Sequence, residues 1–318
     1  MKIVILDGYA LNPGDISWKE VSALGEVVLY DRTKAEDIVC RIGDAEIILT
    51  NKTLITKEVI NACPNLKYIG VLATGYNTID LDAAKEKGII VTNIPDYSTP
   101  SVCQFVFALL LEMCSKVQIH NESVHSGEWV KSLDFCYWKT PLIELAGKNF
   151  GILGYGNIGS SVAKTAKTFG MNVLCCTRTP QKISKDSGVI PVSLDELFEK
   201  SHIISLHAPL TVETKFIINS NSIKKMQTGV LIINTARGPL VKEDDMLKAL
   251  ESGKVGFYGA DVVSKEPMEQ NNPLLHAPNC ILTPHIAWAT KESRSRLIHI
   301  AAKNIESYLN GNCQNSLT

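Results

Sequence analysis

Three polar segments in the last third of the chain carry residue types capable of acid–base chemistry and carboxylate binding. They are Asn234–Gly238, Gly259–Val263 with Glu266 shortly after it, and Thr283–His285. Each lies at the end of an apolar run that we predict to be a β-strand. Open α/β sheets bind their ligands at the carboxyl ends of strands, so we expect these segments to share one site.

Arg237, Glu266 and His285 are the candidate catalytic side chains of these segments. The guanidinium of Arg237 can bind a planar carboxylate or polarise a carbonyl oxygen. Histidine exchanges protons near neutral pH, and a carboxylate such as Glu266 on its second ring nitrogen would fix its tautomer. Taken singly, the three also fit a surface arginine, a solvated acid and a loop histidine. Their joint occurrence favours the catalytic interpretation.

A glycine motif lies upstream, between the apolar run Phe150–Leu153 and a helical pattern. Its residues are Gly154, Tyr155, Gly156, Asn157, Ile158 and Gly159. At a strand-to-helix turn the first glycine permits a tight turn, the second lets a pyrophosphate approach the backbone, and the third lets the helix pack on the strand. The alternative is a turn that merely needs positive φ. The flanking strand and helix favour a dinucleotide site with the pyrophosphate at the helix start.

The end of the next predicted strand, Asn172–Cys176, bears on the choice of cofactor. An NAD-specific fold places an Asp or Glu there to accept the ribose hydroxyls. Here Thr177 and Arg178 follow the strand, and no acid occurs from Ser160 to Lys185. Both side chains can bind a 2′-phosphate, so we predict that NADP(H) is preferred and NAD(H) possible. The alternative is that Arg178 is a solvated surface charge and both cofactors are accepted.

The elements that must position these residues form two series of Val- and Ile-rich runs. The first series is Lys2–Leu6, Val27–Leu29, Ile47–Leu49, Lys67–Val71 and Ile89–Val91; the second is Asn149–Leu153, Asn172–Cys176, Ile203–Leu206, Val230–Asn234, Phe257–Asp261 and Cys280–Leu282. Continuous apolar runs are typical of strands buried on both faces of a parallel sheet. Val102–Val117 has helical spacing, and Thr290 can cap a last helix that stops before Gly311. We therefore predict an α/β protein of two doubly wound, Rossmann-like parallel-sheet domains with a boundary near residue 100.

Composition limits the possible partners and compartments. The 318 residues fit about two domains, and 32 Lys and Arg against 33 Asp and Glu provide no basic surface for nucleic acid. The longest apolar stretch, Val102–Leu111, is too short to cross a membrane, and Asp7 interrupts any signal peptide. Nine cysteines without a Cys-x-x-Cys pair indicate reduced thiols in a cytoplasmic protein and no metal site.

The order of these motifs resembles the D-isomer-specific 2-hydroxyacid dehydrogenases over nearly the whole chain. The resemblance rests on the glycine motif, Asn234–Gly238, Gly259–Val262, Lys265–Pro267 and Thr283–His285. Val71–Asn77 and Ser101–Phe105 are similar to the glycerate dehydrogenase, or hydroxypyruvate reductase, branch.

The resemblance implies a role for each candidate residue. Arg237 would bind the substrate's carboxylate and carbonyl, His285 would be the acid–base, and Glu266 would orient it. The implied cofactor contacts are Asp261 at the nicotinamide carboxamide, His207, Ala208 and Pro209 along the ribose and nicotinamide, and Thr235 and Ala236 before the arginine. The implied substrate contacts are the backbone of Ala73, Thr74 and Gly75. The chain departs from the family pattern at Trp288, whose bulk would narrow the substrate pocket.

The resemblance also implies an architecture. Residues 1–99 plus 288–318 would form a discontinuous substrate domain, and residues 100–287 would form the dinucleotide-binding domain. A homodimer would be built around the cofactor domains. Trp138 would then either reach the neighbouring subunit's site or pack in the interface.

These observations together predict an NAD(P)-dependent D-2-hydroxyacid dehydrogenase that reduces hydroxypyruvate or glyoxylate to D-glycerate or glycolate. One alternative is a D-lactate-type dehydrogenase. Another, of a different class, is a nucleotide-sensing binding protein of the same fold, which turnover of any 2-oxo acid would exclude. A phosphoglycerate dehydrogenase is disfavoured because residues 72–76 contain no cation for a phosphate.

Overall fold

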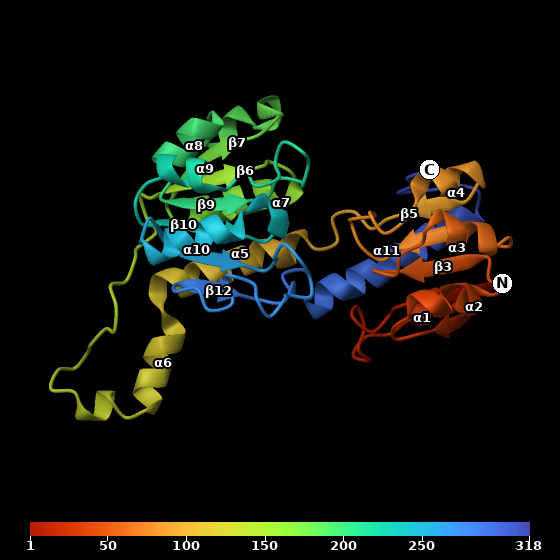
Figure 1. The fold of residues 1–318 in the computed structure, drawn as a ribbon, viewed down its shortest axis with the longest axis horizontal. Coiled ribbons are helices and arrows are strands. Elements are labelled where there is room, and N and C mark those ends of the chain that lie inside the picture. The colour runs from red at the N-terminus through yellow and green to blue at the C-terminus, as the bar shows by residue number, and fades with distance from the viewer. The chain divides into compact units, whose positions relative to one another are not determined.

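The computed structural model describes residues 1–318 and divides the chain into two compact units (Figure 1). The first unit is Met1–Ser98 together with Trp288–Thr318, and the second unit is Thr99–Ala287. Each contains one parallel sheet, which confirms the predicted fold class. The assignment of substrate binding to one unit and dinucleotide binding to the other stays a prediction at this point.

The first unit has five parallel strands in the order β2-β1-β3-β4-β5, a doubly wound order. The strands are β1 (Lys2–Ile5), β2 (Glu26–Leu29), β3 (Ile47–Thr50), β4 (Tyr68–Val71) and β5 (Ile90–Thr92). The helices are α1 (Lys19–Ser22), α2 (Ile38–Ile42), α3 (Lys57–Ala62), α4 (Leu81–Glu86) and α11 (Lys291–Leu309), with a 3₁₀ turn, η1, at Ala35–Asp37.

Successive residues of β1 serve two different cores, because side chains alternate between the faces of a strand. Val4 packs in the cluster that α2, α3 and α4 cover, and Ile3 and Ile5 pack in the cluster that α1 and α11 cover. As predicted, the Thr290 side chain accepts a hydrogen bond at the start of α11, and Gly311 follows its end with φ of 77°.

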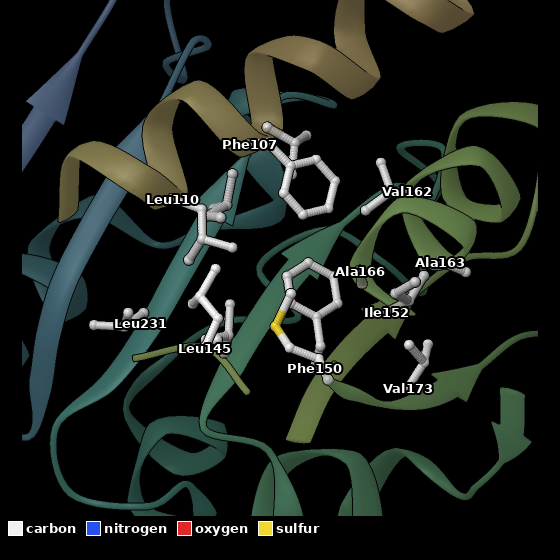
Figure 2. Packing of buried hydrophobic residues seen from close by; sticks show 14 of the residues in the cluster. Phe107, Leu110, Leu145, Phe150, Ile152, Val162, Ala163, Ala166, Val173 and Leu231 are labelled. Atoms are coloured by element: carbon white, nitrogen blue, oxygen red, sulfur yellow. The ribbon is translucent and has the colours of Figure 1, made fainter. Parts of the chain in front are cut away.

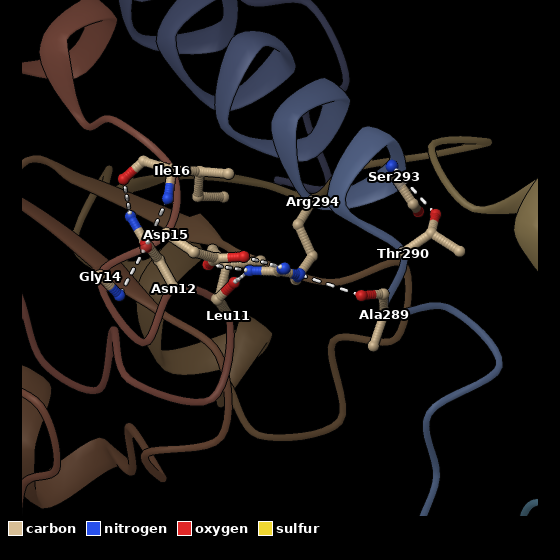
Figure 3. Close-up of polar contacts among 9 residues, drawn as sticks. All are labelled: Leu11, Asn12, Gly14, Asp15, Ile16, Ala289, Thr290, Ser293 and Arg294. Carbon is tan, nitrogen blue, oxygen red and sulfur yellow. Dashed lines mark hydrogen bonds and ion pairs between the residues drawn. The ribbon is translucent and has the colours of Figure 1, made fainter.

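A buried arginine ties the start of α11 to the loop after β1 (Figure 3). Arg294 donates two parallel hydrogen bonds to the carboxylate of Asp15, at 2.7 and 2.6 Å. It also donates to the carbonyl oxygens of Leu11 and Ala289, each at 3.0 Å. All of its bonds go to oxygen acceptors, as a charge removed from water requires.

The second unit has seven parallel strands in the order β12-β11-β10-β9-β6-β7-β8. The strands are β6 (Asn149–Leu153), β7 (Asn172–Cys176), β8 (Val189–Pro191), β9 (Ile203–Leu206), β10 (Val230–Asn234), β11 (Val255–Ala260) and β12 (Cys280–Leu282). The helices are α5 (Thr99–Ser115), α6 (Val117–His125), α7 (Asn157–Thr168), α8 (Leu194–Lys200), α9 (Ser220–Lys225) and α10 (Glu243–Glu251), with 3₁₀ turns η2 (Trp129–Lys131), η3 (Pro180–Lys182), η4 (Lys185–Ser187) and η5 (Gly238–Leu240). The chain order reverses between β6 and β9, so the switch point lies there.

Helices cover both faces of this sheet. Figure 2 shows α5 placing Phe107 and Leu110 over Phe150 of β6, beside Val162 and Ala166 of α7. The rings of Phe107 and Phe150 are stacked with their centroids 6.2 Å apart. The opposite face is covered by α8, α9 and α10. The sheet that carries the candidate site is therefore buried on both sides.

Two sequence predictions are corrected here. The predicted helix through Val117 ends at Ser115, because Lys116 takes a left-handed conformation (φ 53°) with its ammonium over the ring of Phe257. The edge strand β8 was not predicted, since it is only three residues long and ends in a proline.

No single helix has the length and apolar character needed to span a membrane. The helices α5 and α6 meet that test only as a pair, bent by 56°.

Residues 117–142, which we call the arm, project from the second unit (Figure 1). The Tyr137 hydroxyl is hydrogen-bonded to Ser123 of α6 at 2.7 Å, and the Trp129 indole donates to the carbonyl of Phe135 at 3.0 Å. Large apolar side chains nevertheless face water. The most exposed are Leu133 (102%), Val130 (89%), Phe135 (89%) and Trp138 (67%).

Candidate active site

The glycine motif sits at the switch point of the second unit. Gly154 has φ of 100°, and a Cβ there would lie 2.7 Å from the backbone nitrogen of Ala208. The turn after β6 therefore touches the segment after β9. A Cβ on Gly159 would overlap the carbonyl oxygen of Gly154, so the close packing of α7 on the strand requires this glycine. Gly156 differs, because a Cβ there would meet open space.

The start of α7 can receive an anion beside Gly156. Gly156 is the N-cap of this 12-residue helix and offers no side-chain acceptor to the N–H groups of the first turn. Those groups and the helix dipole favour a negative charge at this end. Asn157 begins the helix, while Tyr155 and Ile158 pack against the apolar core beneath it. This geometry fits the pyrophosphate of a dinucleotide.

The end of β7 carries no carboxylate. Half-buried Thr177 accepts a hydrogen bond from the N–H of Thr179 at 3.3 Å, which leaves its own proton to donate. Arg178 is exposed. Its charge helps to lower the pKa of Glu213, although the hydrogen bond from the Thr211 hydroxyl is the larger cause. Arg178 thus presents a cation and Thr177 a hydrogen-bond donor at this strand end, and Glu213 is the acid near the cation.

The segment after β9 presents a neutral histidine. The ring Nε2 of His207 is hydrogen-bonded to the Ser205 hydroxyl at 2.8 Å, and burial lowers the pKa of His207 to about 4. The ring is therefore uncharged at neutral pH. Ala208 is buried and Pro209 is exposed. The hydroxyl of Thr235, at the neighbouring strand end, is buried and has no hydrogen-bond partner in the protein, so it is available to a ligand.

Arg237 lies on a loop shaped by Asn234, the buried last residue of β10. The Asn234 side chain accepts from the N–H of Ala236 at 3.1 Å and donates to the carbonyl of Arg237 at 2.9 Å. The exposed guanidinium of Arg237 donates to the carbonyl of Ala236 at 2.7 Å. A Cβ on Gly238 would overlap the carbonyl group of Val263, so this loop lies directly against the loop after β11.

His285 and Glu266 form a hydrogen-bonded pair. The imidazole Nδ1 lies 2.6 Å from Oε2 of Glu266, and the two side chains are 34% and 37% exposed. The other carboxylate oxygen, Oε1, accepts from the N–H of Val263 at 3.2 Å. The carboxylate is thus held by the backbone and fixes the orientation of the ring, as an acid–base histidine requires.

Asp261 lies buried beside this pair. Desolvation raises the pKa of its carboxyl group, and hydrogen bonds from Thr283, Ala287 and Ile286 oppose that shift.

The remaining predicted residues belong to the first unit. Ala73, Thr74 and Gly75 follow β4, and the Thr74 hydroxyl donates to the carbonyl of Ile94 at 2.8 Å. The N–H groups of Thr74 and Gly75 donate to no acceptor in the protein. Trp288 packs edge-on against Tyr97, with ring centroids 6.4 Å apart. The predicted catalytic and cofactor residues therefore all belong to the second unit, and these four predicted substrate residues belong to the first.

Asn234, Gly238 and Thr283 lie in the segments that the sequence predicts to share this site, but no individual role was predicted for them. Asn side chains at the start of a loop commonly accept a hydrogen bond from the backbone N–H two residues later. The turn-forming role of Asn234 could therefore have been predicted from the sequence. The roles of Gly238 and Thr283 depend on other loops and have no local signal. No cluster of three or more His, Cys, Asp or Glu side chains is arranged to hold a metal ion.

A doubly wound sheet with a glycine turn at its switch point defines the Rossmann-type dinucleotide-binding proteins. Comparisons with known proteins narrow the class. Residues 107–287 match the model of the D-isomer specific 2-hydroxyacid dehydrogenase, NAD binding domain. The chain belongs to the D-isomer-specific 2-hydroxyacid dehydrogenase family, whose members are oxidoreductases acting on the CH–OH group of 2-hydroxy acids.

Similar proteins span the full chain. A hydroxypyruvate reductase from Blautia hydrogenotrophica is 54% identical over 98% of this chain and 98% of its own length. A glycerate dehydrogenase from Methylorubrum extorquens is 39% identical, over 99% and 98% respectively. A crystal structure of D-lactate dehydrogenase from Aquifex aeolicus, complexed with NAD and lactic acid, is 31% identical with a TM-score of 0.83, covering 98% of this chain and 96% of that one.

Gly156 and Gly159 predict different results for the same change to alanine. Gly159→Ala must push α7 away from β6, and we expect a loss of about 1–3 kcal/mol in the free energy of unfolding, as in overpacked cores. Gly156→Ala meets open space, so Tm should stay near wild type while dinucleotide affinity falls, because the methyl group occupies the approach to the backbone. Thermal denaturation and fluorescence titration with NADPH and NADH measure both effects. Wild-type affinity in Gly156→Ala would contradict the assignment of this turn.

Proposed function

We propose that this chain reduces hydroxypyruvate to D-glycerate, and glyoxylate to glycolate, with a nicotinamide dinucleotide bound at the turn Gly154–Gly159. The observation that carries the proposal is the hydrogen-bonded pair of His285 and Glu266, in the same unit as a turn suited to a dinucleotide. The 54% identity to a hydroxypyruvate reductase supports the choice of substrate. The second unit is then the dinucleotide-binding domain, and the first unit is the substrate domain.

The cofactor, when bound, supplies the hydride that reduces C2 of the 2-oxo acid. Arg237 binds the carboxylate of the substrate and stabilises the negative charge that develops on the carbonyl oxygen. His285 donates a proton from Nε2 to that oxygen, because Nδ1 is engaged with Glu266. Glu266 stabilises the imidazolium before transfer and orients the ring throughout.

The other predicted contacts complete the site. Asp261 accepts from the nicotinamide carboxamide, while His207, Ala208, Pro209, Thr235 and Ala236 line the cofactor. Neutral His207 adds no charge beside the nicotinamide. Ala73, Thr74 and Gly75 bind the substrate carboxylate through N–H groups that have no acceptor in the protein, and Trp288 limits the size of the substrate.

Two wider features belong to the proposal. The exposed apolar side chains of the arm support a homodimer, since several large apolar side chains that face water on one segment are typical of an interface. In that dimer Trp138 either reaches the neighbouring site or packs between subunits. All nine cysteines are free thiols, which supports a reducing, cytoplasmic setting.

Loss of the acid–base should remove turnover without removing cofactor binding. We expect kcat/KM to be higher for hydroxypyruvate than for glyoxylate or pyruvate in the wild type. His285→Ala should lower kcat by roughly 10²–10⁴ with each substrate, the usual contribution of general acid catalysis. In Glu266→Gln the carboxylate that orients the ring is lost, so kcat should also fall while cofactor affinity stays near wild type. Near-wild-type rates in either variant would contradict the pair.

The segment after β7 should set the cofactor preference. We expect the wild type to have a higher kcat/KM for NADPH than for NADH, because Thr177 and Arg178 can bind a 2′-phosphate that no carboxylate repels. Thr177→Asp should reverse the preference by adding a like charge. Gln181→Asp, which adds the same charge at an exposed position of η3, is the control and should change it less. A wild type that favours NADH would refute this part of the proposal.

The arm should hold the dimer together. We expect the wild type to sediment as a dimer, and Leu133→Glu combined with Phe135→Glu to sediment as a monomer, because two apolar contacts are replaced by charges. Lys131→Glu adds a negative charge to the same arm without removing an apolar side chain, and should stay dimeric. Analytical ultracentrifugation at several concentrations makes the comparison. A dimeric double variant would show that the interface lies elsewhere.

A further inference from the structure

Asp261 is the only buried acid among the 33 acidic residues of the chain, with 1% of its surface exposed. Its two carboxylate oxygens accept three hydrogen bonds. Oδ1 accepts from the hydroxyl of Thr283 at 2.6 Å and from the N–H of Ile286 at 2.8 Å, and Oδ2 accepts from the N–H of Ala287 at 2.7 Å. All three donors belong to residues 283–287, the segment that carries His285.

This segment holds its histidine in an unfavourable backbone conformation. His285 has φ of 55°, in the left-handed region that few residues other than glycine adopt. Such a conformation persists only when the surrounding structure fixes it. The N–H of His285 donates to the backbone oxygen of Asp261 at 2.9 Å, and the next two N–H groups donate to the side chain of the same residue. Asp261 therefore holds the backbone on the carboxyl-terminal side of the strained residue.

We infer that Asp261 is a positioning residue for His285: its carboxylate fixes residues 283–287 in the one backbone conformation that aims the imidazole at Glu266. The inference adds to the proposed contact with the carboxamide and does not replace it. A carboxylate offers about four acceptor positions, and three are used within the chain, so one is left for a ligand. The expected effect of Asp261 on catalysis rests on the proposed role of His285. The expected effect of Asp261 on the position of the His285 ring does not.

Misplacing His285 should slow the reaction, because proton transfer depends strongly on the distance between donor and acceptor. A shift of about 1 Å in a catalytic group can cost roughly 10² in rate. In Asp261→Asn the amide replaces one acceptor oxygen with an NH₂ group that faces other donors, so residues 283–287 can no longer keep all three bonds. Thr283→Val removes only the hydroxyl donor and leaves both backbone bonds in place. Thr283→Ser keeps the hydroxyl.

The experiment reads the orientation of His285 directly, in the full-length protein with NADPH. The downfield proton resonance of the His285 Nδ1–H···Glu266 bond is assigned by its absence in Glu266→Gln. We expect Asp261→Asn to lose or strongly shift this resonance and to lower kcat by roughly 10²-fold. We expect Thr283→Val to shift the resonance and lower kcat about three- to tenfold, with KM and cofactor affinity nearly unchanged. Thr283→Ser should restore the wild-type signal.

The outcomes separate this inference from the proposed function. If the resonance is unchanged in both Asp261→Asn and Thr283→Val, Asp261 does not position His285, whatever happens to turnover. If the resonance moves as expected but His285→Ala keeps wild-type turnover, the positioning is supported and the proposed function fails. Should Asp261→Asn not fold, the pair Thr283→Val and Thr283→Ser decides, because a purely structural role would lower Tm without moving the signal of the folded protein.

Discussion

The site depends on one row of paired residues that crosses the sheet of the second unit at the ends of its strands. The members of the row, in spatial order, are Cys176, Leu153, Leu206, Asn234, Ala260 and Leu282. The residues that directly follow them are Thr177, Gly154, His207, Thr235, Asp261 and Thr283. Parallel pairing thus ends every strand at the same level and places all six successors along one edge. A slip of one residue in any strand would turn its side chains to the opposite face and break the row.

The sequence predicts this row well because each strand is a continuous apolar run that ends at a polar or small residue. The ends of β6, β7, β9, β10 and β12 fall at the predicted residues. The same runs predict the fold class, since strands buried on both faces need helices on both sides. Residue chemistry then indicates which residues in the loops after the strands matter: a histidine, an acid, an arginine and three glycines are informative when they follow a strand end.

What the sequence could not predict depends on contacts between segments distant in the chain. Nothing local indicates that Gly238 lies against Val263, or that Asp261 accepts hydrogen bonds from backbone N–H groups 25 and 26 residues further along the chain. The break between α5 and α6 is similar, because periodicity continues through Lys116 while its backbone turns left-handed and its ammonium finds an aromatic ring. The three-residue strand β8 is too short to show a pattern. The loops that hold the candidate site residues can therefore be recognised by their composition, but the contacts between these loops are visible only in the three-dimensional structure.

The discontinuity of the first unit has a consequence for biosynthesis. One face of its sheet is covered by α11, whose residues Leu297, Ala301 and Ile305 pack on Ile3 and Ile5 of β1. The last residues also pair with β5: the N–H of Leu317 donates to the carbonyl of Val91 at 2.8 Å. On the ribosome, the strands at the start of the chain therefore emerge long before the helix that covers them, whereas Thr99–Ala287 is contiguous and can fold as it appears. Until α11 has been made, only α1 covers part of this sheet face in the nascent first unit. The first unit is therefore the part of the chain that depends most on chaperones and is most prone to aggregate early.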